Sequence, residues 1–144
     1  MMILLMVKYC LYWVINVKTT STVHGAISIV NALATGKGSA LGISLETTAE
    51  VLLTSENNIE VIINNDKSED ASLAHECFKL VQNQSSESCG AKITVNSDIP
   101  IGRGLKSSSA AASAITLSCL KAFDLNITEK EILDLSVQAS KMLA

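Results

Sequence analysis

The stretch "IPIGRGLKSSSAAASAITL", residues 99–117, combines the single proline of the chain with two glycines, three consecutive serines and a run of small helix-forming residues. Pro100 cannot donate a backbone hydrogen bond to a sheet, and it favours an extended conformation at Ile99, so we expect a strand to end here. Gly102 and Gly104 then permit backbone angles that side chains disfavour. This order predicts a strand, a glycine-containing turn and a helix.

The start of the predicted helix, over residues 107–123, is a candidate anion-binding site. The first backbone N–H groups of a helix have no partner within the helix, and they lie at the positive end of its dipole. Arg103 and Lys106 add positive charge, and three serine hydroxyls follow. Because a charge-assisted hydrogen bond contributes about 1.5–3 kcal/mol, three or four such donors would supply most of the roughly 8 kcal/mol of a micromolar nucleotide affinity.

Spacing alone leaves a second interpretation of this turn open. A glycine turn followed by a helix that serine caps is a common structural feature and binds no ligand. The pattern G-x-x-x-x-G-K-[ST] of many phosphate-binding loops is absent, and G-x-G-x-x-G fails because Ser107 stands where its third glycine would be. The spacing therefore supports phosphate binding and a purely structural turn about equally.

Hydrophobic patterning predicts further strands and helices in the rest of the chain. Short runs of β-branched or alternating apolar residues predict strands over 14–19, 47–54, 59–64 and 91–96. Apolar residues on one helical face predict a helix over 72–82, and Thr128 with Glu131 matches a capping box that begins a third helix. Strands followed by mixed strands and helices predict the α+β class.

Composition and charge exclude several classes of protein. A chain of 144 residues fits one domain, which buries about 70% of its unfolded surface at this size. The formal net charge is −3, and the eleven lysines and arginines are scattered, so we expect no nucleic-acid partner. The four cysteines, Cys10, Cys77, Cys89 and Cys119, share no C-x-x-C pair. They indicate free thiols in a reducing cytoplasm rather than a disulfide framework.

The N-terminal stretch "MMILLMVKYCLYWVINV", residues 1–17, is strongly apolar. It is shorter than the roughly 20 apolar residues of a membrane-spanning helix, Lys8 interrupts it, and it has neither the basic start nor the small-residue cleavage site of a signal peptide. We therefore expect a buried first strand and no membrane partner, with a membrane or export segment as the less favoured alternative. Residues 1–13 are interpreted as an apolar extension and residues 14–144 as the domain.

The segment "PIGRGLKSSSAAA" resembles the nucleotide-binding motif P-x-x-x-G-L-G-S-S-A-A of the GHMP kinases, the superfamily of galactokinase, homoserine kinase, mevalonate kinase and phosphomevalonate kinase. Matching residues stand at Pro100, Gly104, Leu105, Ser107, Ser108, Ala110 and Ala111. Lys106 and Ser109 depart from the motif, but both resemble the G-L-K-S-S-S loop of one branch, the archaeal shikimate kinases. Residues 24–51, with the turn "ATGKGSA", are similar to the N-terminal region of that branch.

This resemblance implies a GHMP kinase N-terminal domain, with the ribosomal protein S5 domain 2-like fold and a nucleotide loop at a helix N-terminus. It implies the transfer of a phosphoryl group from ATP, with Mg²⁺, to the 3-hydroxyl of shikimate, a step of aromatic amino-acid biosynthesis. The nucleotide-binding residues that it implies are Pro100, Ile101, Gly102, Arg103, Gly104, Leu105, Lys106, Ser107, Ser108, Ser109 and Ala110. Ser108 is the residue expected nearest to Mg²⁺.

The resemblance also implies a basic group from the N-terminal segment at the reacting centre. Lys37 is the residue expected to approach the transferring phosphoryl group or the shikimate carboxylate. Phosphoryl transfer needs such a group because catalysis comes largely from alignment and from neutralising charge. The alternative is that Lys37, between Gly36 and Gly38, belongs to an ordinary exposed turn.

GHMP kinases are longer than this chain. Their second half carries an acidic residue, used by many members as a base or Mg²⁺ ligand, and a further glycine-rich motif, and neither is recognisable before Ala144. We therefore expect an N-terminal portion without its C-terminal half. Two alternatives to a shikimate kinase stay open. One is a kinase of another small alcohol such as homoserine or mevalonate, against which Lys106 and Ser109 argue; the other is an inactive nucleotide-binding fragment.

Overall fold

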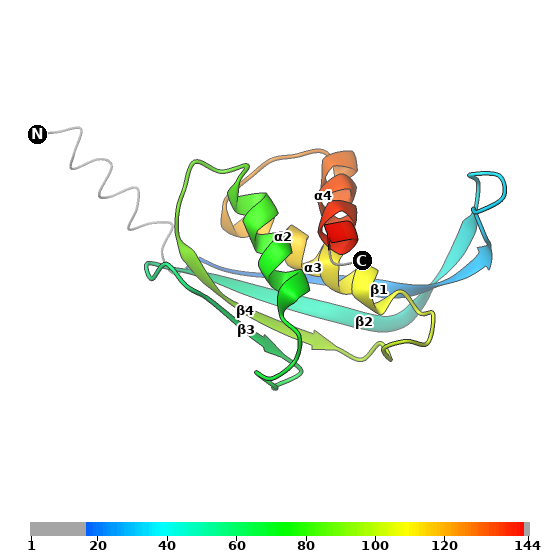
Figure 1. Cartoon of the computed structure of the whole chain (residues 1–144), viewed down its shortest axis with the longest axis horizontal. Coiled ribbons are helices and arrows are strands. Elements are labelled where there is room, and N and C mark those ends of the chain that lie inside the picture. Colours follow the sequence, from blue (N-terminus) through cyan, green and yellow to red (C-terminus); the bar gives the residue numbers. More distant parts are fainter. Residues whose placement is uncertain (1–16, 143–144) are drawn as a thin grey trace, which may run out of the picture.

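The computed structural model describes residues 17–142, and these form one sheet with helices on one side of it (Figure 1). In chain order the elements are β1 (Lys18–Val30), β2 (Ser39–Thr54), β3 (Ile59–Ile63), α2 (Ser72–Gln82), β4 (Gly90–Ser97), α3 (Ser107–Ala122) and α4 (Glu129–Met142). The expected α+β class is confirmed by this order. The sheet carries the long β1–β2 hairpin at one side and the shorter β3 at the other.

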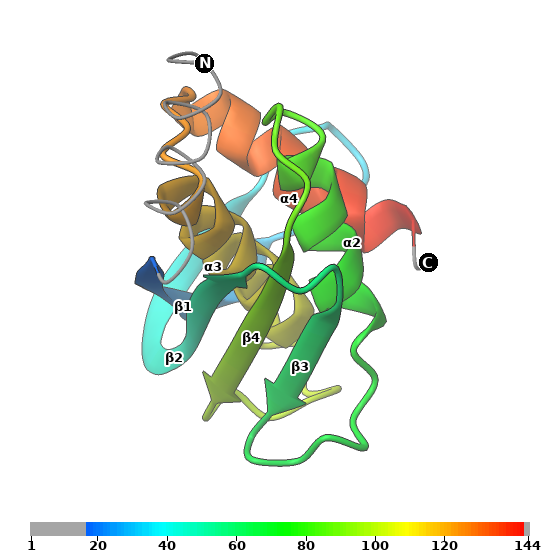
Figure 2. The same ribbon diagram turned by 90° about the vertical axis from the view of Figure 1, so that its left-hand side faces the viewer.

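The strand order in the sheet is β1-β2-β4-β3. Strand β2 pairs antiparallel with both β1 and β4, whereas β3 and β4 are parallel. A parallel pair needs a crossover, and α2 supplies it between β3 and β4 (Figure 2). This arrangement brings the ends of β3 and β4 together beside the first turn of α3.

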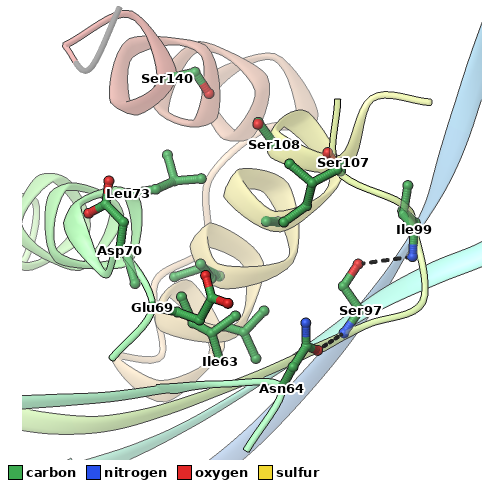
Figure 3. Close-up of a pocket in the computed structure, with 15 residues that line it drawn as sticks. Ile63, Asn64, Glu69, Asp70, Leu73, Ser97, Ile99, Ser107, Ser108 and Ser140 are labelled. Carbon is green, nitrogen blue, oxygen red and sulfur yellow. Dashed lines mark hydrogen bonds between the residues drawn. The ribbon is translucent and has the colours of Figure 1, made fainter. Parts of the chain in front are cut away.

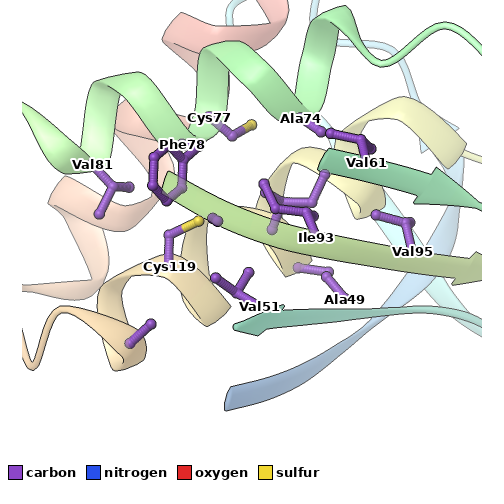
Figure 4. Packing of buried hydrophobic residues seen from close by; sticks show 14 of the residues in the cluster. Ala49, Val51, Val61, Ala74, Cys77, Phe78, Val81, Ile93, Val95 and Cys119 are labelled. Atoms are coloured by element: carbon purple, nitrogen blue, oxygen red, sulfur yellow. The ribbon is translucent and has the colours of Figure 1, made fainter. Parts of the chain in front are cut away.

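The hydrophobic core lies between the sheet and the helices (Figure 4). Ala49, Val51 and Leu53 alternate along β2 with residues that face away from the helices, and Ile93 opposite Val51 continues the buried face on β4. The Phe78 side chain of α2 packs over them and is fully buried. Each large apolar side chain buried in this way contributes about 1.5–3 kcal/mol.

Helix α3 lies closest to the sheet because its buried face is made of small residues. Ala112 and Ala114 are fully buried. The Ser118 hydroxyl donates to the Ala49 carbonyl oxygen at 2.7 Å, and the Thr19 hydroxyl donates to the Ser118 carbonyl oxygen at 2.7 Å. These bonds join α3 to β2 and β1, so the position of its first turn is fixed relative to the hairpin.

Most of the predicted elements are present with small changes of boundary. The helix expected over 72–82 is α2, and the helix expected over 107–123 is α3, which ends one residue earlier. The capping box at Thr128 is confirmed, because its hydroxyl and backbone N–H both donate to a carboxylate oxygen of Glu131, each at 2.7 Å.

The N-terminal strands differ from the sequence prediction. Strand β1 continues to Val30, well beyond the expected 14–19, and β2 begins at Ser39 rather than at 47. The reason is that the outer half of the β1–β2 hairpin is exposed, so its residues have no buried face to produce the expected pattern. The predictions for residues 1–13, and for the start of the first strand at 14–16, lie outside the described residues.

Within residues 17–142 no helix is long and apolar enough to cross a membrane. The cysteines of this part of the chain, Cys77, Cys89 and Cys119, are free thiols as expected. Cys10 lies outside the described residues. Burial raises the pKa of the Cys77 thiol to about 11 and raises that of Cys119 well above its ordinary value, which makes both unreactive core residues.

Candidate functional site

The turn between β4 and α3 is here called the glycine loop, residues 99–106. Its backbone is left-handed at three positions, with φ +72° at Gly102, +73° at Gly104 and +63° at Lys106. Glycine adopts this conformation without strain, and Lys106 adopts it at the cap position of α3. The glycines are therefore needed for the path of the loop.

The first turn of α3 has unpaired backbone donors. Within the described residues no side chain caps this helix, and its first backbone hydrogen bond runs from the Ala110 N–H to the Lys106 carbonyl oxygen at 2.9 Å. The N–H groups of Ser107, Ser108 and Ser109 precede that bond and lie at the positive end of the helix dipole. The interpretation in which a serine caps the helix is therefore wrong, and the donors stay available to an anion.

The glycine loop is open to solvent. Gly102, Gly104 and Ser108 are exposed, and a Cβ atom added at either glycine would have no heavy atom within 4 Å. Close packing within the protein therefore does not explain these glycines. The space beside both glycines is open.

A cavity of about 450 Å³ borders the first turn of α3 (Figure 3). Its volume lies within the range of small-molecule sites. Apolar side chains form much of its wall: Ile63, Leu73, Ala74, Val95, Ile99, Ile101, Ala111 and Ile115. Polar side chains complete it: Asn64, Glu69, Asp70, Ser97, Ser107, Ser108 and Ser140. Mostly apolar walls with a few polar groups are typical of sites for organic ligands.

Hydrogen bonds fix the polar wall of this cavity between β3 and β4. Asn64 donates its backbone N–H to the Val95 carbonyl oxygen and accepts from the Ser97 N–H through its side-chain oxygen, both at 2.8 Å. The Ser97 hydroxyl bonds to the Thr47 hydroxyl at 2.7 Å and accepts from the Ile99 N–H at 3.3 Å. The wall is therefore preorganised and continuous with the start of the glycine loop.

Sequence reasoning missed the cavity residues that lie outside the glycine loop and the first turn of α3. Asn64, with φ +48°, begins the polar turn after β3, and Asp70 accepts hydrogen bonds from the backbone and hydroxyl of Ser72 at the start of α2. The polar run "NNDKSED" directly after an apolar strand was the available signal. It did not show that this turn lies opposite the glycine loop, because that follows from the β3–β4 pairing.

The donor set suits a magnesium ion held mainly by phosphate. Within residues 17–142 no group of three His, Cys, Asp or Glu side chains could hold a metal ion by itself. Mg²⁺ in nucleotide sites keeps several waters and binds phosphate oxygens with only one or two protein ligands. Ser108, which the sequence predicts nearest to Mg²⁺, is exposed in the first turn of α3, and its role as a ligand stays a prediction.

Lys37 lies away from the glycine loop. It is exposed at the tip of the β1–β2 hairpin, where its backbone N–H donates to the Thr35 hydroxyl at 3.3 Å. Both ribbon views place this tip at a distance from the turn between β4 and α3 (Figures 1 and 2). Residues 100–110 form one continuous loop and helix start, and Lys37 does not lie beside them. Its catalytic role therefore stays a prediction.

Comparisons with known proteins agree on one family. The model of the GHMP kinases N terminal domain matches residues 72–143. A curated shikimate kinase from Pyrococcus abyssi is 40% identical over 118 residues, which are 81% of this chain and 43% of that kinase. The chain thus spans less than half the length of this relative.

Solved structures share the fold. The mevalonate kinase of Methanococcus jannaschii superposes with a TM-score of 0.77 at 18% identity, over 88% of this chain and 47% of that one. The protein MDDEF, solved with MVAPP, AMPPCP and magnesium, gives a TM-score of 0.71 at 19% identity, over 85% of this chain and 42% of that one. Identities this low show a common fold and nothing further.

Proposed function

Because this chain belongs to the GHMP kinases, whose N-terminal domain matches half of its length, we propose that it is the nucleotide-binding part of a shikimate kinase. The reaction would transfer the terminal phosphoryl group of ATP to the 3-hydroxyl of shikimate and release ADP. The observation that carries the proposal is the uncapped first turn of α3, which follows a left-handed glycine loop and borders a cavity of nucleoside size.

We expect a nucleotide to bind with its phosphates at the start of α3 and its nucleoside in the cavity. The N–H groups of Ser107, Ser108 and Ser109 would bind phosphate oxygens, because they have no other partner in the described residues. Arg103 and Lys106 would add positive charge at the rim. The apolar wall of the adjoining cavity would receive the nucleoside, so the phosphates would lie over the glycine loop.

Two features of the site would favour phosphoryl transfer. Backbone donors aimed at the phosphates neutralise negative charge without having to reorganise during the reaction. A magnesium ion, bound by phosphate oxygens and the Ser108 hydroxyl, would supply further charge neutralisation. Lys37 is retained as the candidate basic group near the transferring phosphoryl group, although its contacts in the described residues are confined to the hairpin tip.

Shikimate is favoured over other alcohols for two reasons. Lys106 and Ser109 resemble the loop of the archaeal shikimate kinases, and the Pyrococcus abyssi relative carries that name at 40% identity. The mevalonate kinase from Methanococcus jannaschii shares only 18% identity, which supports the fold but not its substrate. Phosphorylation of homoserine or mevalonate at the same site is therefore the less favoured hypothesis.

The proposal also covers the pathway, the cellular location and the partners of the protein. Phosphorylation of shikimate would place the chain in aromatic amino-acid biosynthesis in the cytoplasm, with a small molecule rather than a nucleic acid or a membrane as its partner. Residues 14–144 would be the nucleotide-binding domain. Because the chain spans 43% of the Pyrococcus abyssi kinase, we propose that a C-terminal half supplies the catalytic base and much of the shikimate site.

The test is ADP release with Mg²⁺ and ATP in the presence of shikimate, homoserine or mevalonate, measured for the 144-residue chain and for any longer product of its gene. Turnover with shikimate only is the expected result for the longer product. Turnover with homoserine or mevalonate instead would refute the substrate assignment. Calorimetric titration of the 144-residue chain with ATP and Mg²⁺ separates the steps, because micromolar binding without turnover identifies the nucleotide-binding part alone.

A further inference from the structure

Both ends of the glycine loop are attached to the β1–β2 hairpin. Before the loop, a carboxylate oxygen of Asp98 accepts from the Glu46 N–H at 2.6 Å, and the Asp98 N–H donates to the Glu46 carbonyl oxygen at 3.2 Å. At its far end, the Ala26 N–H donates to the Leu105 carbonyl oxygen at 3.2 Å. The hairpin therefore holds the loop on both sides of its glycines.

Gly25 makes the second attachment possible. It is buried in β1 at an irregularity of the pairing between His24 and Ala26. A Cβ atom at this position would lie 2.8 Å from the Leu105 carbonyl oxygen and 3.1 Å from a side-chain methyl of Ile99. The oxygen belongs to the backbone of the loop and cannot turn aside as a side chain can, so any side chain at position 25 requires β1 and the loop to move apart.

A displacement of Leu105 would move the backbone N–H groups that are proposed to bind phosphate. Leu105 precedes Lys106, the cap residue of α3, and the N–H groups of Ser107 and Ser108 follow. Those donors have no side-chain cap to fix them, so their position depends on how the loop end is held. Hydrogen bonds weaken steeply when distance or angle departs from the optimum, and a misplacement of about 1 Å can reduce a catalytic rate about 100-fold.

We propose that Gly25 is a positioning residue of the nucleotide site, which sets the glycine loop and the first turn of α3 against β1 through the Leu105 carbonyl oxygen. This inference rests on the proposed function, because it assigns the purpose of the contact to nucleotide binding. Asp98 has the corresponding role at the start of the loop. Neither residue is a ligand of the nucleotide in this account, and both act through the backbone of the loop.

Gly42 provides a matched control. It lies opposite Ala26 in the same hairpin, one step from Gly25, and a Cβ atom added there has no heavy atom within 4 Å. Gly25→Ala and Gly42→Ala therefore add the same methyl group to neighbouring positions of two paired strands. Only the first meets the glycine loop.

The experiment measures two properties of the 144-residue chain and both variants: the Kd for ATP with Mg²⁺ and the rate of amide hydrogen exchange at residues 105–110. We expect Gly25→Ala to raise the Kd between about 10- and 100-fold and to accelerate exchange there, whereas Gly42→Ala stays within about twofold of the unsubstituted chain in both. Unchanged Kd and exchange in Gly25→Ala, or equal effects of the two variants, would overturn the inference.

Failure of the proposed function gives a different result. If the unsubstituted chain does not bind ATP, the nucleotide site is refuted, and the exchange rates alone decide whether Gly25 positions the loop.

If Gly25→Ala does not fold, variants of Asp98 test whether the hairpin positions the loop. Asp98→Ala, which removes the acceptor for the Glu46 N–H, should weaken ATP binding, and Asp98→Asn, which keeps an acceptor oxygen, should restore it. Equal affinities of these two variants would refute the positioning role.

Discussion

Two turns of this chain carry the pattern glycine, basic residue, glycine. One is Gly36-Lys37-Gly38 at the tip of the β1–β2 hairpin, and the other is Gly102-Arg103-Gly104 before α3. The first glycine of each is left-handed, with φ +71° at Gly36 and +72° at Gly102. The two turns therefore share a sequence pattern and a left-handed first glycine, but only the second turn also has a left-handed last glycine, Gly104 with φ +73°.

They differ in the element that follows. The hairpin tip leads into a strand, and its polar groups bond locally, as the Gly36 N–H does to the Ala32 carbonyl oxygen at 2.8 Å. The glycine loop leads into a helix whose first donors are unpaired, beside a cavity of about 450 Å³. The motif alone therefore makes a turn, and only the turn that leads into α3 places unpaired backbone N–H groups beside a cavity.

The largest expected effect comes from valine at the left-handed glycines. Gly104→Val and Gly36→Val place a β-branched residue at almost the same φ, each with open space around the new Cβ, so both should lower the free energy of unfolding by at least about 1–2 kcal/mol. Only Gly104→Val should abolish ATP binding in calorimetry, by moving the loop. Equal loss in Gly36→Val would mean that binding follows global stability instead.

The next effect isolates the hydroxyl assigned to magnesium. Ser108→Ala should weaken binding of ATP about 10-fold when Mg²⁺ is present and much less when it is absent, because hydrogen bonds to charged groups are worth about 1.5–3 kcal/mol. Ser39→Ala removes an exposed hydroxyl just after the hairpin tip and serves as the control. A Ser108→Ala chain with the same dependence on Mg²⁺ as the unsubstituted chain would remove this serine from the metal site.

Removal of the basic side chain at either turn should change the Kd for ATP less than these substitutions do. Arg103→Met should raise the Kd for ATP by about 2- to 5-fold at low salt, because an exposed charge contributes only about 0.2–1 kcal/mol and is screened. Lys37→Met should leave the Kd of the 144-residue chain for ATP unchanged and lower the rate of shikimate phosphorylation by the longer product of the gene. Full turnover by Lys37→Met would identify Lys37 as a residue of the turn only.

The smallest effect concerns α4, whose start is capped whereas that of α3 is not. Hydrogen bonds from Thr128 hold the pKa of the Glu131 carboxyl below its ordinary value of 4.5. Because the pKa of this carboxyl is lower in the folded state than in the unfolded state, the ionised carboxylate stabilises the folded state when the pH is above the unfolded-state pKa. This stabilisation is lost as the pH falls through the folded-state pKa. Glu131→Gln should slightly lower the melting temperature at pH 7 and flatten its decrease below pH 4.5, with ATP affinity unchanged. An unchanged pH profile would show that this cap contributes nothing.

The sequence predicted the elements whose apolar residues are buried. Phe78 and Val81 lie on the buried face of α2, and the bounds of that helix match the prediction. The outer half of the hairpin could not be found in this way, because Ile29 and Leu33, with exposed fractions of 66% and 92%, follow no pattern of burial. Strand pairing, rather than a buried face, defines that part of the chain.

The sequence predicted only the part of the candidate site that lies in one continuous segment. The glycines and serines of 102–109 predict an anion site from local chemistry, which can be recognised in the sequence. The cavity and the contact of Gly25 with Leu105 join segments about 80 residues apart, as their numbers show. Such contacts follow from sheet pairing, so no local pattern at Gly25 could identify its role.

The nucleotide site is tested most directly by an NMR titration of the isotopically labelled 144-residue chain with ATP and Mg²⁺, in which the amide resonances of both turns are followed together. We expect saturable shifts at residues 102–110 and at the cavity wall, with the resonances of 34–40 unchanged. Absence of shifts at 102–110, or equal shifts at both turns, would contradict the claim that the uncapped start of α3 makes the nucleotide site.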